Sequence, residues 1–178
     1  MIEHNIDIST DDGQMATFIT HPESGGPHPV VLFLIDAPGK REELHDMARR
    51  ISATGYYVVL SNLYYRDARS FTVHREDPAS AEHMFSLMAN LDNRLVAQDA
   101  AAMLAHAEAD AVADTSRVGV TGYCMSGPFA LWIAAEFPEV VKSAASIHGV
   151  RLAVDAEDSP HTRVAEMKGE ILVMAAEH

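Results

Sequence analysis

The sequence is poor in basic residues and cysteine and has no long apolar run, and each shortage excludes a class of protein. Its 178 residues contain 13 Lys and Arg against 26 Asp and Glu, a formal charge of −13. So acidic a chain is not expected to bind nucleic acid or an anionic membrane surface, because both require clustered cations. Its single cysteine, Cys124, excludes an internal disulfide and a cysteine-only zinc site. No stretch approaches the ~18 apolar residues of a membrane-spanning helix.

The amino terminus lacks the basic and apolar regions of a secretion signal, and with the unpaired cysteine this favours a reducing compartment. We therefore expect a cytoplasmic protein. At ~100–200 residues per domain, the length predicts one domain over residues 1–178. Hydrophobic residues make up 48% and charged residues 22%, a balance typical of a globular protein rather than a disordered one.

Two hydrophobic patterns indicate the fold class. Residues 2–8 alternate between apolar and polar, and an Asp12-Gly13 turn precedes a second strand at 15–20, which predicts an antiparallel hairpin. Beyond the hairpin, apolar strands alternate with segments at helical spacing. The strands are expected at 30–35, 56–60, 118–123, 143–147 and 171–176, and the helices at 42–53, 80–91, 93–111 and 129–137. This order predicts an α/β protein with a mostly parallel sheet covered by helices on both faces.

A strand that runs directly into a helix carries the most informative motif, Gly122-Tyr-Cys124-Met-Ser126. The pattern is typical of a nucleophile elbow, in which a strained turn holds the nucleophile and small residues two positions to either side let neighbouring chains approach. Gly122 and Ser126 are those small residues. A thiol at a helix N-terminus lies at the positive end of the helix dipole, which favours the thiolate. The Met125 amide points to where an oxyanion would form.

Two other interpretations of Cys124 remain open. A lone cysteine in a globular protein is most often a buried, inert side chain. An exposed reactive thiol in a non-catalytic, hydrolase-like domain would instead serve redox sensing. Alkylation rates across pH separate the inert thiol from the two reactive cases, and ester turnover separates those two from each other.

Over nearly the whole chain the sequence resembles the dienelactone hydrolases, a branch of the α/β-hydrolases whose elbow reads Gly-Tyr-Cys-x-Gly-Gly. Here the segment reads Gly122-Tyr-Cys-Met-Ser-Gly127, which differs only at Ser126. The resemblance implies the α/β-hydrolase fold and hydrolysis of a small lactone or carboxylic ester through a cysteinyl acyl-enzyme. It also implies an oxyanion hole formed by the backbone amides of Ala37 and Met125.

The same loop of the family carries a glutamate that communicates with the thiol, and Asp36 stands at that position in this sequence. Its side chain is one methylene shorter. From the residues alone, Asp36 has an alternative role, in which it caps the following helix or pairs with Arg41. The resemblance makes Asp36 a candidate catalytic residue beside Cys124.

The sequence departs from the family at the other two members of the catalytic triad. The family takes its acid just after the strand that matches 171–176 and its histidine from a later loop. Here Glu177 is the only carboxylate at the position of the acid, and His178 does not match the histidine. We therefore expect the sequence to stop before the triad acid and base, so that the 178-residue chain alone is nearly inactive.

A second departure concerns the arginine with which the family meets a substrate carboxylate, because the matching region reads Ala79-Ser-Ala-Glu82. The long polar loop before it supplies other arginines. We expect Arg66, which lies beside Tyr65 at the end of a strand, to contact an anionic substrate, since parallel sheets bind ligands at that edge. The remaining arginines of the loop are more simply explained as surface residues that balance nearby carboxylates: Arg69 and Arg75.

His148 directly follows the strand at 143–147, where it would either line the pocket or cap the strand end. The ten histidines match no metal-binding spacing, so we expect no metal, and no motif calls for a cofactor. The expected partner is a small, anionic substrate.

Overall fold

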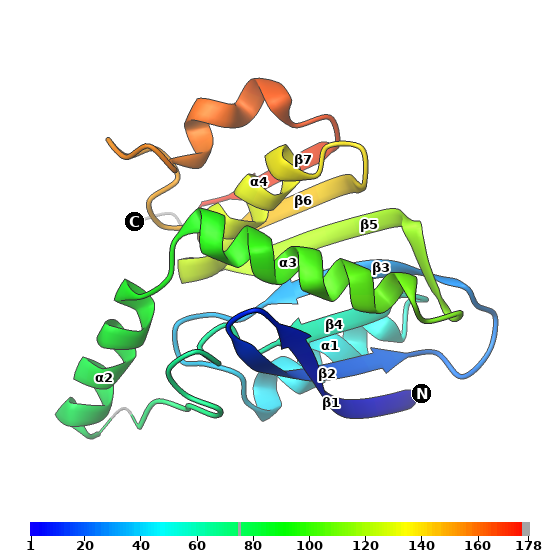
Figure 1. The fold of residues 1–178 in the computed structure, drawn as a ribbon, viewed down its shortest axis with the longest axis horizontal. Coiled ribbons are helices and arrows are strands. Elements are labelled where there is room, and N and C mark those ends of the chain that lie inside the picture. The colour runs from blue at the N-terminus through cyan, green and yellow to red at the C-terminus, as the bar shows by residue number, and fades with distance from the viewer. Residues whose placement is uncertain (75, 176–178) are drawn as a thin grey trace.

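The centre of the computed structural model, which describes residues 1–74 and 76–175, is a seven-stranded sheet in the order β1-β2-β4-β3-β5-β6-β7 (Figure 1). The first two strands form the predicted hairpin, whose second strand pairs antiparallel with β4, and all other pairs in the sheet are parallel. The predicted fold class is therefore confirmed. The strands are β1 (Ile2–Thr10), β2 (Gly13–His21), β3 (His28–Leu34), β4 (Tyr57–Ser61), β5 (Ala113–Tyr123), β6 (Val141–Ile147) and β7 (Glu170–Met174).

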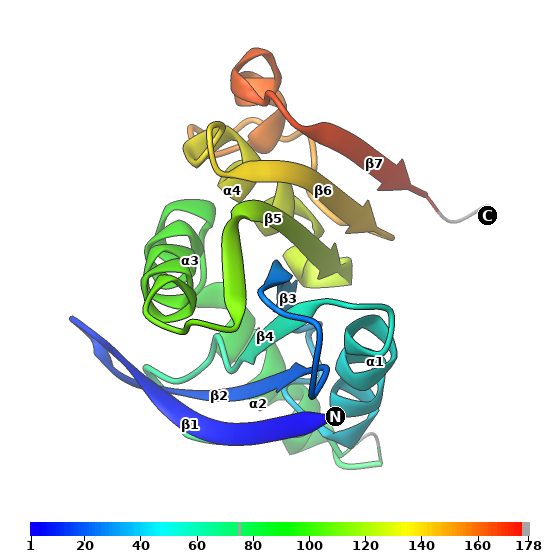
Figure 2. The same cartoon turned by 90° about the vertical axis from the view of Figure 1, so that its right-hand side faces the viewer.

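Helices lie on both faces of this sheet. Figure 2 shows α1 on one face and α3 with α4 on the other. The helices are α1 (Glu42–Ser52), α2 (Pro78–Ala89), α3 (Asn93–Glu108) and α4 (Gly127–Glu136), with the short 3-10 turns η1 (Cys124–Ser126) and η2 (Pro160–Glu166). None of the helices in the described ranges is both long and apolar enough to span a membrane.

The most completely buried residues lie in the middle of the sheet, and they hold the carboxyl ends of the central strands in place. Every residue of β4 is buried, as the apolar run in its sequence predicts. The helix α4 is buried from Gly127 to Ala135, because it packs between α3, β6 and η2. In contrast, α2 buries only Leu87. The turn that leads into α4 is thus held by well-packed elements, whereas α2 lies at the periphery.

Several element boundaries differ by a few residues from the predicted ones, and two of these differences have a clear local cause. The strand β5 begins at Ala113 rather than at residue 118, because its polar first half still pairs with the start of β3 before a register shift at Pro29. The helix α2 begins at Pro78, which suits a first helical position, and the Asp77 carboxylate accepts the Ala79 N–H.

The face of the sheet that carries α1 is open toward β7. A hollow of about 750 Å³ lies there between Ile51 of α1 and Ile171 of β7. The side chains of β7 are strongly exposed: Ile171 40%, Leu172 52%, Val173 51% and Met174 47%. Among the described residues, this strand therefore has no helix covering its apolar side chains.

Candidate active site

The carboxyl ends of three neighbouring strands bring the predicted catalytic residues to one edge of the sheet. Because β3 lies between β4 and β5, the segments that follow these three strands are adjacent. Asp36 and Ala37 follow β3, Tyr64 follows β4, and Cys124 follows β5. Open parallel sheets bind ligands at this kind of edge.

Cys124 has the backbone of a nucleophile elbow. Its φ angle is 52°, in the left-handed region that non-glycine residues rarely adopt. Its side chain is exposed at the turn between β5 and α4. A Cβ atom on Gly122 would lie 2.1 Å from the carbonyl oxygen of Ser126, so the turn closes only with glycine at that position. Within the described ranges no side chain hydrogen-bonds the Cys124 thiol.

Ser126, the departure from the family motif, stabilises the same turn. Its buried hydroxyl accepts the Tyr123 N–H at 2.9 Å and donates to the Tyr123 carbonyl oxygen at 3.1 Å. At the next position, Gly127, the fold has no room for a side chain. A Cβ atom on Gly127 would lie 2.5 Å from the Gly149 Cα. The serine is therefore compatible with the elbow.

Tyr64 connects the two residues proposed for the oxyanion hole. Its hydroxyl donates to the Ala37 carbonyl oxygen at 2.9 Å and lies 3.2 Å from the sulfur of Met125. Burial raises the pKa of Tyr64 above the ordinary value, and the nearby Asp36 and Cys124 raise it further, so the phenol remains a donor. The Ala37 N–H donates no hydrogen bond to the part of the chain that is described. An anionic oxygen beside it would find a free donor.

Asp36 is held by Arg41 rather than pointing freely at the thiol. The Arg41 guanidinium contacts both carboxylate oxygens of Asp36, at 2.5 and 3.0 Å. This hydrogen-bonded pair raises the pKa of Arg41. Of the alternatives for Asp36, pairing with Arg41 is the one observed, while capping is not, since α1 has no side-chain cap. A catalytic role for Asp36 stays a prediction.

Tyr65 and Arg66 meet a buried carboxylate that sequence reasoning did not identify. The Arg66 guanidinium contacts both oxygens of Asp99, at 2.7 and 3.0 Å, and its Nε donates to Asp12 at 2.7 Å. The Tyr65 hydroxyl donates to Asp99 at 2.9 Å. The Asp99 side chain is 1% exposed, so this cluster joins the loop after β4 to α3. The structure thus gives Arg66 and Tyr65 protein partners, and their contact with substrate stays a prediction.

The remaining residues singled out from the sequence make other contacts or lie outside the described residues. His148 is exposed, and its backbone N–H donates to the Met174 carbonyl oxygen at 2.8 Å, at the ends of β6 and β7. Arg69 pairs with Asp7 at 2.9 Å and is 70% exposed, in line with a surface role. Three residues named above lie outside the described residues: Arg75, Glu177 and His178.

A hollow of about 420 Å³ adjoins the elbow on the side of Met125. It lies between α2, the start of α4 and the segment after His148. Arg151, exposed and with a φ angle of 56°, is the only cation among the described residues that line it. The apolar lining residues are Phe85, Met88, Ala89, Leu91, Met125, Pro128, Phe129, Val150 and Val154.

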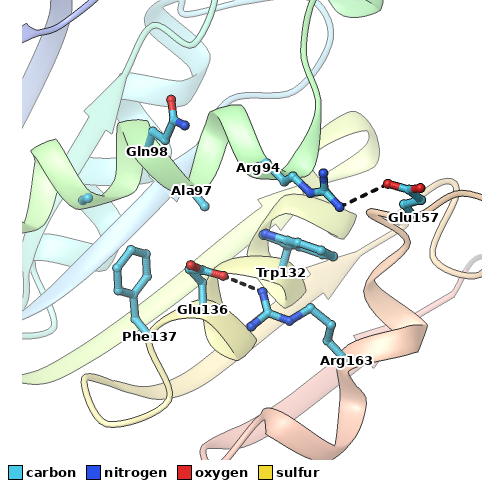
Figure 3. Close-up of a pocket in the computed structure, with 9 residues that line it drawn as sticks. Arg94, Ala97, Gln98, Trp132, Glu136, Phe137, Glu157 and Arg163 are labelled. Atoms are coloured by element: carbon cyan, nitrogen blue, oxygen red, sulfur yellow. Dashed lines mark hydrogen bonds and ion pairs between the residues drawn. The ribbon is translucent and has the colours of Figure 1, made fainter.

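A second hollow, of about 700 Å³, lies between α3, α4 and η2 (Figure 3). Its charged side chains neutralise one another, since Arg163 contacts Glu136 at 2.5 Å and Arg94 lies 3.6 Å from Glu157. The Arg163 guanidinium also lies over the Trp132 ring, 4.7 Å from its centroid. This hollow contains none of the residues predicted for catalysis. The described ranges also contain no group of three or more His, Cys, Asp or Glu placed to hold a metal ion.

The chain matches known proteins over most of its length. The model of the dienelactone hydrolase family matches residues 15–178. A protein of Methylorubrum extorquens, named as a proposed carboxymethylenebutenolidase, is 27% identical over 176 residues, which cover 97% of this chain and 58% of that protein. A protein of Yersinia pestis with the same name is 28% identical over 145 residues, 80% of this chain and 51% of its own length. The chain therefore spans somewhat over half the length of these relatives.

Solved structures confirm the predicted α/β-hydrolase fold. A Klebsiella pneumoniae protein, named as a proposed dienelactone hydrolase, superimposes with a TM-score of 0.82 at 22% identity and covers 97% of this chain and 71% of that one. The dienelactone hydrolase of Anabaena variabilis gives a TM-score of 0.68 at 18% identity, over 97% of this chain and 72% of that one.

Proposed function

The chain belongs to the dienelactone hydrolase family, and from that premise we propose that it hydrolyses a small lactone or carboxylic ester through a thioester formed on Cys124. The observation that carries the proposal is the Cys124 backbone. A φ angle of 52° at an exposed thiol costs of order 1–3 kcal/mol, and such strain is concentrated at functional sites. An inert structural cysteine would not need it.

In the first step, the Cys124 thiol loses its proton to a water molecule, the resulting thiolate sulfur attacks the carbonyl carbon, and the carbonyl oxygen becomes an oxyanion. The amides of Met125 and Ala37 are the proposed donors to that oxygen. Collapse of the tetrahedral intermediate forms the thioester and expels an alkoxide, which takes up a proton to become an alcohol. In a lactone, that alcohol stays attached to the acyl chain. Water then attacks the thioester, releasing the acid and restoring the thiol.

The substrate side of the proposal rests on the charge distribution. A protein with a formal charge of −13 repels anions unless a cation stands where the ligand binds. Arg66 was the candidate from sequence, but its guanidinium is engaged by Asp99 and Asp12. Arg151, at the hollow beside Met125, has no ion-pair partner among the described residues. We therefore assign the contact with the carboxylate of a small anionic substrate to Arg151 rather than to Arg66.

The test is ester and lactone turnover by the full-length gene product and by two variants of its nucleophile. Cys124→Ala is expected to lose turnover to the background rate. Cys124→Ser is expected to keep the fold but to be strongly impaired, because a hydroxyl ionises far less readily than a thiol. Full turnover in Cys124→Ala would overturn the assignment of the nucleophile, with circular dichroism of both variants as the control for folding.

A further inference from the structure

We propose that the hollow beside Met125 is a subsite for an apolar alkyl or aryl group of the substrate, bounded on its outer side by Phe85 of α2. This inference rests on the proposed hydrolysis at Cys124 and specifies the substrate class: esters or lactones that carry an apolar group in addition to the reacting carbonyl.

The hollow is tied to the nucleophile by two residues of its lining. Met125 directly follows Cys124 in the chain. The backbone N–H of Val150 donates to the carbonyl oxygen of Cys124 at 3.2 Å. Cys124 itself does not line the hollow, so an acyl group attached to the thiol would reach the hollow past Met125 and Val150.

Apart from Arg151, the proposed contact for a substrate carboxylate, the chemistry of the lining favours an apolar occupant. Most of the lining side chains are aliphatic, aromatic or methionine, and they come from α2, α4 and the segment around 150–154. The acidic lining residues already have donors. Asp92 caps α3 by accepting the Leu95 N–H at 2.7 Å, and Asp158 accepts the backbone N–H of Asn93 at 3.1 Å. The volume of about 420 Å³ lies within the usual ~300–1,000 Å³ of ligand pockets.

Phe85 is the lining residue that stands to gain most from a ligand. Its side chain is 60% exposed, although it is large and apolar, and α2 is anchored by Leu87 alone as a fully buried residue. An apolar group in the hollow would remove the Phe85 ring from water and would in turn be covered by it. The exposed phenylalanine is thereby explained as one wall of a binding site.

The first experiment compares p-nitrophenyl acetate, butyrate and hexanoate. We expect kcat/KM to rise about 3-fold for each methylene group that enters the hollow. Phe85→Ala is expected to lower kcat/KM for the hexanoate about 10-fold and to leave that for the acetate within 2-fold. The matched control is Val164→Ala in η2, because Val164 is 59% exposed and does not line the hollow. That variant is expected to match the wild type with all three esters.

The second experiment measures the subsite without catalysis. Cys124 is the only thiol, so its alkylation by N-ethylmaleimide and N-hexylmaleimide can be followed by mass, with each rate divided by that for free cysteine. We expect the hexyl reagent to react at least 5-fold faster, and the excess to disappear in Phe85→Ala. If esters are not hydrolysed but this excess is found, the subsite stands and the proposed function fails. If esters are hydrolysed with no preference for chain length and the two reagents react equally, the subsite is overturned and the proposed function stands.

Discussion

The phenol oxygen of Tyr64 lies 2.9 Å from the carbonyl oxygen of Ala37, to which it donates a hydrogen bond. Its 3.2 Å separation from the sulfur of Met125 places the same phenol beside the other residue of the proposed oxyanion hole. Oxyanion holes act through donors that are fixed before the reaction. Tyr64, which follows β4, therefore positions the loop after β3, with Ala37, against the turn after β5, with Met125.

Removing the Tyr64 hydroxyl is expected to slow turnover more than it weakens binding. Tyr64→Phe keeps the ring but leaves the Ala37 carbonyl without its donor, which costs about 1 kcal/mol of stability. We expect kcat to fall about 10-fold with KM within 2-fold, because Tyr64 positions the Ala37 amide and does not touch the substrate. Tyr56→Phe is the control, since Tyr56 is 39% exposed and lies on another part of the molecule. Unchanged kcat in Tyr64→Phe would contradict the positioning role.

The contact between Arg66 and Asp99 predicts a loss of stability when either partner is removed. The Asp99 side chain is 1% exposed, and removing the guanidinium leaves a buried carboxylate without its closest cation. We expect Arg66→Ala to lower the free energy of unfolding by about 3 kcal/mol in urea titrations. The exposed Arg50→Ala should change it by less than ~0.5 kcal/mol. The substrate prediction for Arg66 is tested in the same variant, since it requires KM to rise for anionic esters and not for neutral ones.

Arg151 is expected to distinguish anionic from neutral substrates. A hydrogen bond between a guanidinium and a carboxylate contributes about 1.5–3 kcal/mol. Arg151→Ala should therefore raise KM about 10-fold or more for an ester that carries a carboxylate, with the KM for its neutral analogue nearly unchanged. Arg151→Lys retains the charge but not the bidentate geometry and should recover part of the loss. An equal effect on both esters would show that Arg151 only shapes the loop.

The titration of His45 is expected to contribute to the pH dependence of the free energy of unfolding. The His45 ring stacks on Phe18 with centroids 4.4 Å apart, and burial lowers the pKa of His45 below its ordinary value. Of the charged groups around it, Glu42 opposes this shift, while Lys40 and Arg49 add to it. The unfolded chain therefore takes up a proton at a higher pH than the folded one. Stability from this residue is present above about pH 6.5 and is lost as the pH falls through the lowered pKa.

The measurement is the free energy of unfolding in urea at pH 7 and pH 5. His45→Gln removes the titrating group, so its loss of stability between the two pH values should be smaller than that of the wild type. His106→Gln, in the last turn of α3, serves as the matched control. An identical pH dependence in wild type and His45→Gln would refute the assignment.

Local patterns in the sequence predicted the features of the fold and site that depend on adjacent residues. The hairpin, the buried strands and the Gly122-Tyr-Cys124 elbow follow from periodicity and from the need for a small residue before the nucleophile. The contacts between side chains that are distant in the sequence could not be predicted from these local patterns. Arg66 and Asp99 are 33 residues apart and meet because the loop after β4 lies against α3, which no local pattern encodes. Tyr64 and Tyr65 are adjacent in the sequence, and only their contacts in the fold show that Tyr64 meets Ala37 and Met125 whereas Tyr65 meets Asp99.

Trapping the acyl-enzyme tests the central claim most directly. The protein is mixed with a p-nitrophenyl ester, quenched in acid within milliseconds to seconds, and analysed by intact mass and peptide mapping. The account predicts a mass increase equal to one acyl group, located on Cys124 as a thioester that hydroxylamine removes, and no such adduct in Cys124→Ala. Turnover of the ester with no acyl group on Cys124 at any quench time, or undiminished turnover in Cys124→Ala, would contradict it.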